Sequence, residues 1–196
     1  MNYLPYVILL ITILLTSCSD DTDNAVDPAS VQNEVRYNST RYALQNGLLN
    51  NYGETANHFN IDFSVSDGAF TPFLANTGNG FLITLWSVSD ATVEIAAELY
   101  SPGTDGFRPG TFEYTSLSEQ EVDSRSLVGQ YFFNEAYVAV DLNNDIDLSE
   151  DEEIRVTGGT IRVSGTYPRY MLVYDLALAN GATLRGSYDK EFILDE

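Results

Sequence analysis

Hydrophobic and polar residues alternate with a period of two along most of the chain after residue 36. In residues 59–65 every second side chain is large and apolar, and polar side chains stand between them. The same alternation predicts further strands at residues 93–99, 136–140, 154–156, 161–163 and 170–178. Residues 81–88 are apolar on both faces, which predicts a central strand that is covered on both sides.

Turn motifs separate the predicted strands, and no stretch of this part of the chain has a convincing helical period. The motifs are Asn46-Gly47, Asp67-Gly68, Pro109-Gly110, Gly158-Gly159 and Asn180-Gly181. About ten mostly antiparallel strands predict an all-β fold, either an antiparallel β-sandwich or a lipocalin-like β-barrel. We favour the sandwich, because strands with two apolar faces suit stacked sheets better than an open barrel filled by a ligand.

The N-terminus resembles an export signal. Its apolar stretch from Val7 to Leu15 is about half the length that a membrane-spanning helix needs. The following residues, Leu15-Thr16-Ser17-Cys18, resemble the lipobox of bacterial lipoproteins, although no Lys or Arg precedes the apolar stretch. The resemblance implies cleavage before Cys18, acylation of Cys18 and anchoring in a membrane through the acyl chains. The alternative is an ordinary secretory signal with a chance cysteine.

The predicted organisation therefore has three parts. Residues 1–17 form a lipoprotein signal peptide, residues 18–35 an acidic tether after the lipidated Cys18, and residues 36–196 a single β domain. Residues 19–35 contain five acidic side chains and no basic one, as expected of a solvated tether.

Two further features resemble lipoproteins of the Bacteroidota. The acidic cluster after Cys18 resembles their surface-export signal, and the sequences Pro109–Tyr114, Gly158–Gly165 and Tyr174–Gly181 resemble those of a set of their small all-β lipoproteins. The resemblance implies a cell-envelope protein of the outer membrane, exposed at the cell surface. It implies no reaction, because that set has no established activity.

Composition excludes several classes of function. The chain has 9 basic and 29 acidic residues, and its net charge of −20 repels nucleic-acid phosphates. One histidine and one cysteine cannot form a zinc site of Cys and His ligands or a disulfide. We therefore expect no nucleic-acid partner, and a protein or glycan partner remains open.

The acidic segment from Asp141 to Glu153 matches the spacing of a twelve-residue calcium loop. The predicted ligands are Asp141, Asn143, Asp145, Asp147 through its carbonyl, Ser149 through water, and Glu152. Ile146 departs from the pattern, because it stands where the turn needs a positive φ and usually has glycine. The alternative is a solvated acidic hairpin loop without a metal.

No nucleophile motif such as G-x-S-x-G is present, so we expect no catalytic residues. His58 is expected on a solvent-facing surface. Trp86 and Tyr100 would form a sugar-binding platform if they shared an exposed face, although a Trp in so apolar a strand is more often in the core. The sequence favours a non-catalytic, lipid-anchored surface lipoprotein that acts as a binding or structural module. The alternatives are a glycan-binding or glycan-degrading accessory protein and a carrier of hydrophobic ligands.

Overall fold

A computed structural model describes residues 32–78, 82–117 and 127–195. The predicted signal peptide, Cys18 and most of the predicted tether lie outside these ranges. The described residues form thirteen strands and a short 3-10 helix: β1 (Glu34–Tyr37), β2 (Thr40–Ala43), β3 (Asn46–Thr55), β4 (His58–Ser66), β5 (Ala69–Asn76), β6 (Leu82–Ser89), β7 (Val93–Pro102), β8 (Thr111–Tyr114), β9 (Phe132–Val140), η3 (Glu150–Glu152), β10 (Glu153–Thr166), β11 (Arg169–Leu178), β12 (Thr183–Glu191) and β13 (Ile193–Asp195). No helix in the described ranges is long and apolar enough to cross a membrane.

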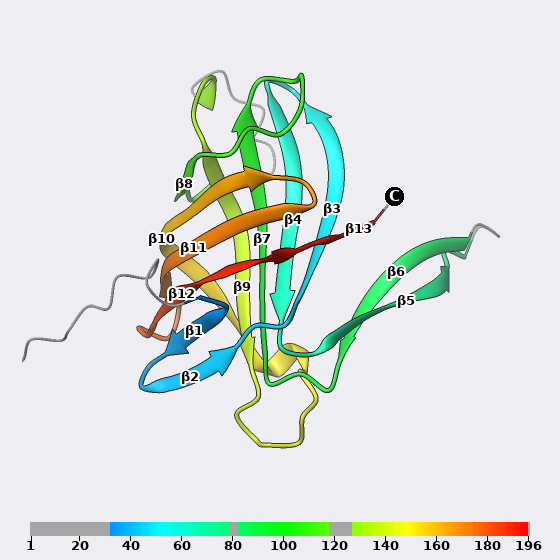
Figure 1. Cartoon of the computed structure of the whole chain (residues 1–196), viewed down its shortest axis with the longest axis vertical. Coiled ribbons are helices and arrows are strands. Elements are labelled where there is room, and N and C mark those ends of the chain that lie inside the picture. The colour runs from blue at the N-terminus through cyan, green and yellow to red at the C-terminus, as the bar shows by residue number, and fades with distance from the viewer. Residues whose placement is uncertain (1–31, 79–81, 118–126, 196) are drawn as a thin grey trace, which may run out of the picture.

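One curled sheet contains eleven of these strands. Neighbouring strands from β3 through β4, β7, β9, β10 and β11 to β12 pair antiparallel. Strand β12 leads through Phe192 into β13, and β13 pairs in parallel with β3, so the sheet curls and the chain from β12 returns to the β3 edge (Figure 1). Opposite walls of the sheet pack across one interior, as the layers of a sandwich or the wall of a small barrel do.

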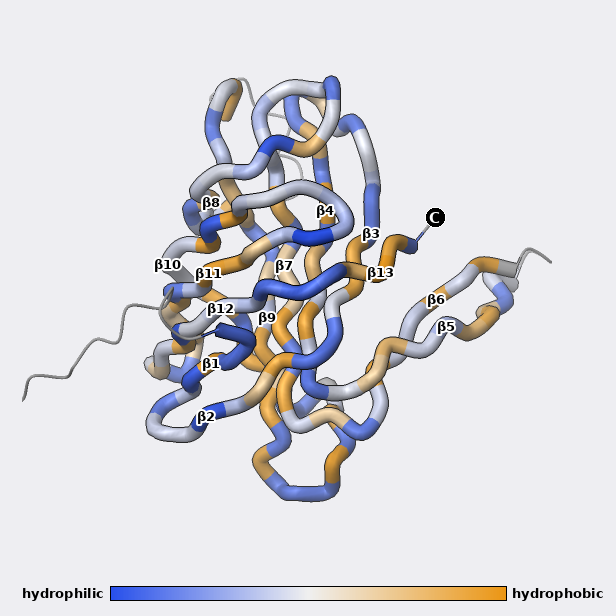
Figure 2. Tube along the Cα trace, viewed as in Figure 1, coloured by the Kyte–Doolittle hydropathy of each residue, from blue (hydrophilic) through white to orange (hydrophobic). Residues whose placement is uncertain are grey.

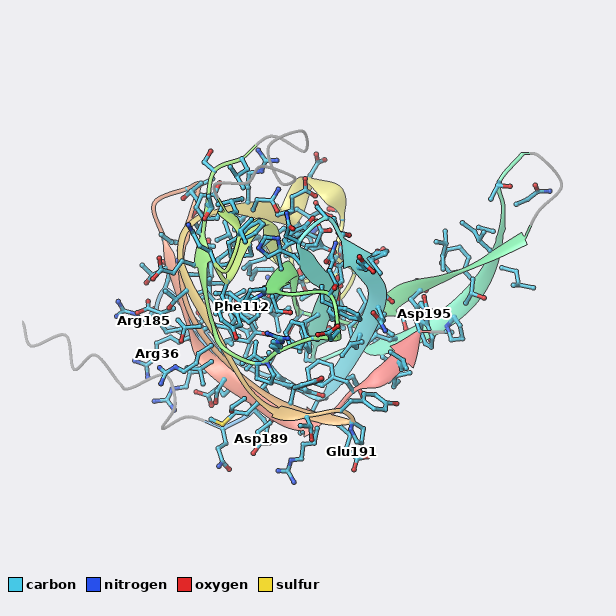
Figure 3. The ribbon with its side chains drawn as sticks, turned by 90° about the horizontal axis from the view of Figure 1, so that it is seen from above. Arg36, Phe112, Arg185, Asp189, Glu191 and Asp195 are labelled. Carbon is cyan, nitrogen blue, oxygen red and sulfur yellow. The ribbon has the colours of Figure 1, made fainter. Side chains whose placement is uncertain are left out.

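Aromatic side chains fill this interior. Phe63 contacts the ring edges of Tyr170 and Phe192, with centroids 5.4 Å and 5.2 Å away. Seen from above, Phe112 points into the middle of the curled sheet (Figure 3), and Tyr174 is completely enclosed. All thirteen strands pair within residues 34–195, so we expect this range to fold without the segment that precedes it.

The all-β prediction is confirmed, with differences in detail. The sheet is mixed rather than purely antiparallel, because β8 pairs in parallel with β9 and β13 with β3. Strand β1 begins at Glu34, inside the predicted tether. The motif Gly158-Gly159 lies within β10 instead of in a turn. There β10 has an irregular register with β11, and a Cβ on Gly159 would lie 2.1 Å from the Asp175 carbonyl oxygen.

The prediction of a central strand at residues 81–88 is wrong. Strand β6 pairs only with β5 in a separate two-stranded sheet that projects from the body, which we call the ribbon (Figures 1 and 2). The exposed fractions of Ile83 and Leu85 on β6 are 44% and 40%. An apolar run of this length is compatible with a buried strand and with an exposed ribbon, and periodicity does not separate the two.

Candidate functional site

The outer face of the curled sheet carries acidic side chains where β4 and β7 pair. Asp62 stands directly opposite Glu98, and Ser66 directly opposite Glu94. Between these rows, Ser64 stands opposite Ala96. Asp62, Ser64, Glu94, Ala96 and Glu98 alternate with buried core positions and therefore point outward, whereas Ser66 at the end of β4 is buried. Because the middle pair is small, the surface is recessed between two rows that carry carboxylates.

The ribbon overhangs this recess. Phe70, Trp86 and Val88, near the base of the ribbon, lie with the outer face of the sheet around a cleft of about 580 Å³, which we call the ribbon cleft. Asp195, at the end of β13, lies on the side of the body from which the ribbon projects (Figure 3). The described lining residues are Leu48, Asn50, Asn51, Tyr52, Asp62, Ser64, Phe70, Thr84, Leu85, Trp86, Val88, Glu94, Ala96, Tyr137 and Asp195. Three of them are acidic and none is basic.

A second hollow of about 410 Å³ adjoins the ribbon cleft. The two share Asp62, Ala96 and Tyr137, so they form one groove along the sheet. The described lining of the second hollow is Asp62, Ala96, Ala97, Glu98, Glu135, Ala136, Tyr137, Glu153 and Arg155. Its four carboxyl groups face one basic side chain, so the groove as a whole has an excess of negative charge.

Arg41, Arg108, Arg169 and Arg185 form ion pairs with acids outside the groove. Arg185 contacts Asp175 at 2.9 Å, on the wall formed by β11 and β12. Figure 3 shows Arg185 and Arg36 on the side of the body away from the ribbon. In the described part of the chain, Arg155 is the one basic residue that lines the groove, so most of its carboxyl groups have no basic partner there.

Burial and mutual repulsion raise the pKa of two carboxyl groups in the groove. The pKa of Asp62 rises to about 6, first through burial and then through the charges of Glu98 and Glu135, while a hydrogen bond with Tyr52 opposes the rise. The pKa of Glu94 rises to about 7 through burial and the charge of Glu153. Both groups thus exchange protons near neutral pH, which is typical of functional sites.

Glu98 has a different environment from Asp62. Its Oε1 accepts hydrogen bonds from the Asn60 amide and from the Tyr100 hydroxyl, the latter at 2.7 Å. Asp62, by contrast, is about half protonated near pH 6, because burial and the neighbouring charges raise its pKa. The two carboxyl groups stand directly opposite one another on β4 and β7, so the glycan-degrading alternative would use this pair.

Several buried polar atoms of the ribbon cleft lack a hydrogen-bond partner in the described part of the chain. They are Oδ1 of Asn50, Oδ1 of Asp62 and Nε1 of Trp86. Buried polar groups in folded proteins are generally paired, and an unpaired one destabilises the fold. Two acceptors and one donor around this cleft are therefore without a partner in the described part of the chain.

The base of the ribbon is held firmly. Asp67 Oδ1 accepts the backbone N–H groups of Thr92 and Val93 at 2.8 Å and 3.0 Å, and its Oδ2 is bonded to the Thr92 hydroxyl. Asn46 Nδ2 donates to the Gly68 carbonyl at 2.7 Å. A Cβ on Gly68 would lie 2.4 Å from the Ser89 carbonyl oxygen, so the two ends of the ribbon approach as closely as glycine allows. These contacts hold the two ends of the ribbon together where they leave the body.

The predicted calcium ligands lie together in the loop between β9 and β10. Asp141 accepts the N–H groups of Asn144 and Ile146, at 2.6 Å and 3.1 Å. Glu152 is buried and accepts the N–H groups of Leu142 and Ser149, which lower its pKa. Asn143, Asp145 and Asp147 follow the outside of the turn, where Asn143 and Asp145 each accept an N–H two residues ahead. In the described ranges, no group of three or more acidic, His or Cys side chains is placed to hold a metal ion.

Ile146 adopts the positive φ that the calcium pattern requires at its position, although it is not glycine. Its φ is 65°, in the left-handed region, so a β-branched residue occupies the position where calcium loops usually have glycine.

The sugar-binding platform, which required Trp86 and Tyr100 to share an exposed face, is not formed, because Tyr100 is buried and stacked on Phe132, with ring centroids 4.7 Å apart. Two expectations fail. His58 is 1% exposed instead of solvent-facing, and its Nε2 lies 3.0 Å from the Leu127 carbonyl oxygen. Trp86 lies in the ribbon cleft and not in the core.

Sequence reasoning missed the groove. The period-two pattern separated Asp62, Glu94 and Glu98 from the core positions, but it did not reveal that these polar faces adjoin.

No family model, curated protein or solved structure matches this chain.

Proposed function

We propose that the protein is a non-catalytic binding module that holds a cationic ligand with a flat or apolar part in the ribbon cleft. The observation that carries the proposal is the pairing of an acidic floor with an apolar, aromatic roof. Asp62 and Glu94 lie on the sheet, and Phe70, Trp86 and Val88 lie above them on the ribbon. An amine or guanidinium would neutralise the half-buried carboxylates, and the apolar part of the ligand would contact the indole face.

Electrostatics support a cation over an anion or a neutral ligand. Buried carboxyl groups that repel one another destabilise the folded protein. A bound cation would relieve the repulsion by lowering both pKa values, and an anion would increase it. The proposal also includes the lipid anchor on Cys18 and a location at the outer membrane, which rest on the N-terminal sequence alone.

The single tryptophan of the chain gives a direct test, because Trp86 lies in the ribbon cleft. We would titrate the chain with phenethylamine and with phenethyl alcohol, its uncharged counterpart, and record tryptophan fluorescence. We expect saturable binding of the amine only. Asp62→Asn should weaken binding, and Asp151→Asn, at an exposed position of η3, should not. Equal responses to both probes, or equal effects of the two variants, would contradict the proposal.

Glycan binding is the second candidate, and the unpartnered atoms of Asn50, Asp62 and Trp86 favour it. Sugar hydroxyls donate and accept hydrogen bonds, and a sugar ring stacks on an indole face. Neutral oligosaccharides belong in the same fluorescence titration. Saturable binding of an oligosaccharide without a response to the amine would replace the cation proposal. Release of reducing ends that depends on Asp62 and Glu98 would show the degrading activity.

The third candidate, a carrier of hydrophobic ligands, gains no support from the interior. Phe63, Tyr170, Phe192 and their aromatic neighbours occupy the space inside the curled sheet.

A separate proposal concerns calcium in the loop of residues 141–152. The left-handed Ile146 supports it, since the departure from the calcium pattern does not prevent the required turn. Binding would require the carboxylates of Asp141, Asp145 and Glu152 to gather around the ion beside the Asp147 carbonyl, since no such group is gathered in the described ranges. Thermal melts in EGTA, calcium and magnesium test it. A calcium-specific rise in Tm that Asp145→Ala abolishes would support the site, and equal melts would contradict it.

A further inference from the structure

The ribbon differs in charge from the rest of the molecule. Residues 68–89 contain no acidic or basic side chain, although the chain carries a net charge of −20 and Asp67 and Asp90 flank this segment. Strands β5 and β6 account for most of it, and they pair over their whole length. A surface element without charge in so acidic a protein is suited to a neutral environment.

The outer part of the ribbon exposes large apolar side chains on both of its faces. Phe73 and Ile83 lie on one face, because Phe73 alternates with Ala75 and Ala75 is the partner of Ile83. Leu74, opposite Thr84, lies on the other face. Their exposed fractions are 46%, 44% and 67%. We call Phe73, Leu74 and Ile83 the distal patch; none of the three lines the ribbon cleft.

The distal patch is also held away from the body. The ribbon extends outward from its base in both views (Figures 1 and 3), and the Asp67 and Asn46 hydrogen bonds hold that base. These bonds lie at the neck of the ribbon, between the residues that precede β5 and those that follow β6 or begin β3. In this arrangement the exposed apolar side chains of the outer ribbon are not covered by the described part of the chain.

We propose that the distal patch inserts into the surface of an electrically neutral lipid bilayer. A bilayer surrounds an inserted ribbon and covers both of its faces, whereas a single protein surface packed against one face would leave the other in water. A second copy carries the same charge of −20, so pairing of two copies opposes strong repulsion. A basic protein partner would find no carboxylate between residues 68 and 89. The hydrocarbon of a bilayer, by contrast, accepts an uncharged apolar segment without a charged group to pair with.

The test uses the chain from Ser19 onward, without signal peptide or acyl chain, and phosphatidylcholine vesicles. Flotation with the vesicles should carry the protein, and raising the salt concentration should not release it. Leu74→Glu should weaken partitioning roughly tenfold or more, because a carboxylate would have to enter the bilayer. Leu142→Glu is the matched control, since Leu142 is 61% exposed on the loop after β9 and gains the same charge.

A second measurement locates the ribbon in the bilayer. In a Trp86→Phe background, Leu74→Trp places the only indole in the distal patch, and brominated lipids should quench its fluorescence. Failure of the unsubstituted chain to float, absence of quenching, or equal partitioning of the two Glu variants would each overturn the proposal. Dimerisation that Leu74→Glu abolishes, without vesicle binding, would assign the distal patch to a second copy instead.

Discussion

Replacing Glu94 by glutamine should stabilise the protein at pH 8. Burial and the charge of Glu153 raise the pKa of Glu94 from 4.5 to about 7, so the folded state binds this proton more tightly than the unfolded state does. The stabilising contribution of the protonated group is complete below about pH 4.5 and is lost as the pH rises through about 7. At pH 8 the charged carboxylate destabilises the fold, and the neutral amide of glutamine removes that effect.

The size of the effect follows from the same pKa. The difference between about 7 and 4.5 corresponds to at most roughly 3.5 kcal/mol, at about 1.4 kcal/mol per pH unit. For a domain of this size, this is an increase in Tm of at most roughly 7–14 °C. At pH 4 both forms are uncharged, so the two proteins should melt at nearly the same temperature.

Thermal melts of the two proteins at pH 4 and pH 8 measure this difference. Glu54→Gln, at an exposed position on β3, is the matched control and should change Tm little at either pH. A lower Tm for Glu94→Gln at pH 8, or the same shift at both pH values, would refute the electrostatic reasoning. The variant should also bind phenethylamine more weakly. The charge of the Glu94 carboxylate destabilises the folded protein but attracts the bound cation, so its removal raises stability and lowers affinity.

Three further predictions follow from other parts of the molecule. Gly159→Ala should lower Tm strongly, because the φ of Gly159 is 103° and an added Cβ would lie 2.1 Å from a backbone oxygen. Gly53→Ala, whose added Cβ has no atom within 4 Å, should lower Tm less, and equal decreases in Tm would contradict this. Glu152→Gln should destabilise the protein more at pH 7 than at pH 3, because a group with a lowered pKa stabilises the fold when charged and loses this effect on protonation; thermal melts at the two pH values test it. Asp67→Ala should loosen the ribbon base, so amide hydrogen exchange in β5 and β6 should accelerate while exchange in β11 does not change.

The sequence predicted which side of each main strand faces the core. Ile61, Phe63 and Ile95 are buried, and Asp62 and Glu94 lie on the outer face, as the period-two pattern required. This success has a physical reason, since alternation reports burial of one face directly. The all-β class follows from the same signal.

The ribbon cleft could not be predicted from the sequence for two reasons. Pairing between β4 and β7 joins strands that are separated by the ribbon, and alternation within a strand carries no information about its neighbours. The hydropathy of residues 81–88 predicted burial, although the ribbon carries this segment outward. Trp86 was therefore assigned to the core, and the overhang that forms the ribbon cleft could not be anticipated.

Calorimetry with phenethylamine at pH 7, in two buffers of different ionisation enthalpy, tests the central claim most directly. If a cation binds beside Asp62 and Glu94, it lowers pKa values that now stand at about 6 and about 7, so protons leave the protein on binding. The observed binding enthalpy should then differ between the buffers, and the difference should shrink in the Glu94→Gln variant. Binding without release of protons, or no binding of the amine, would contradict the account.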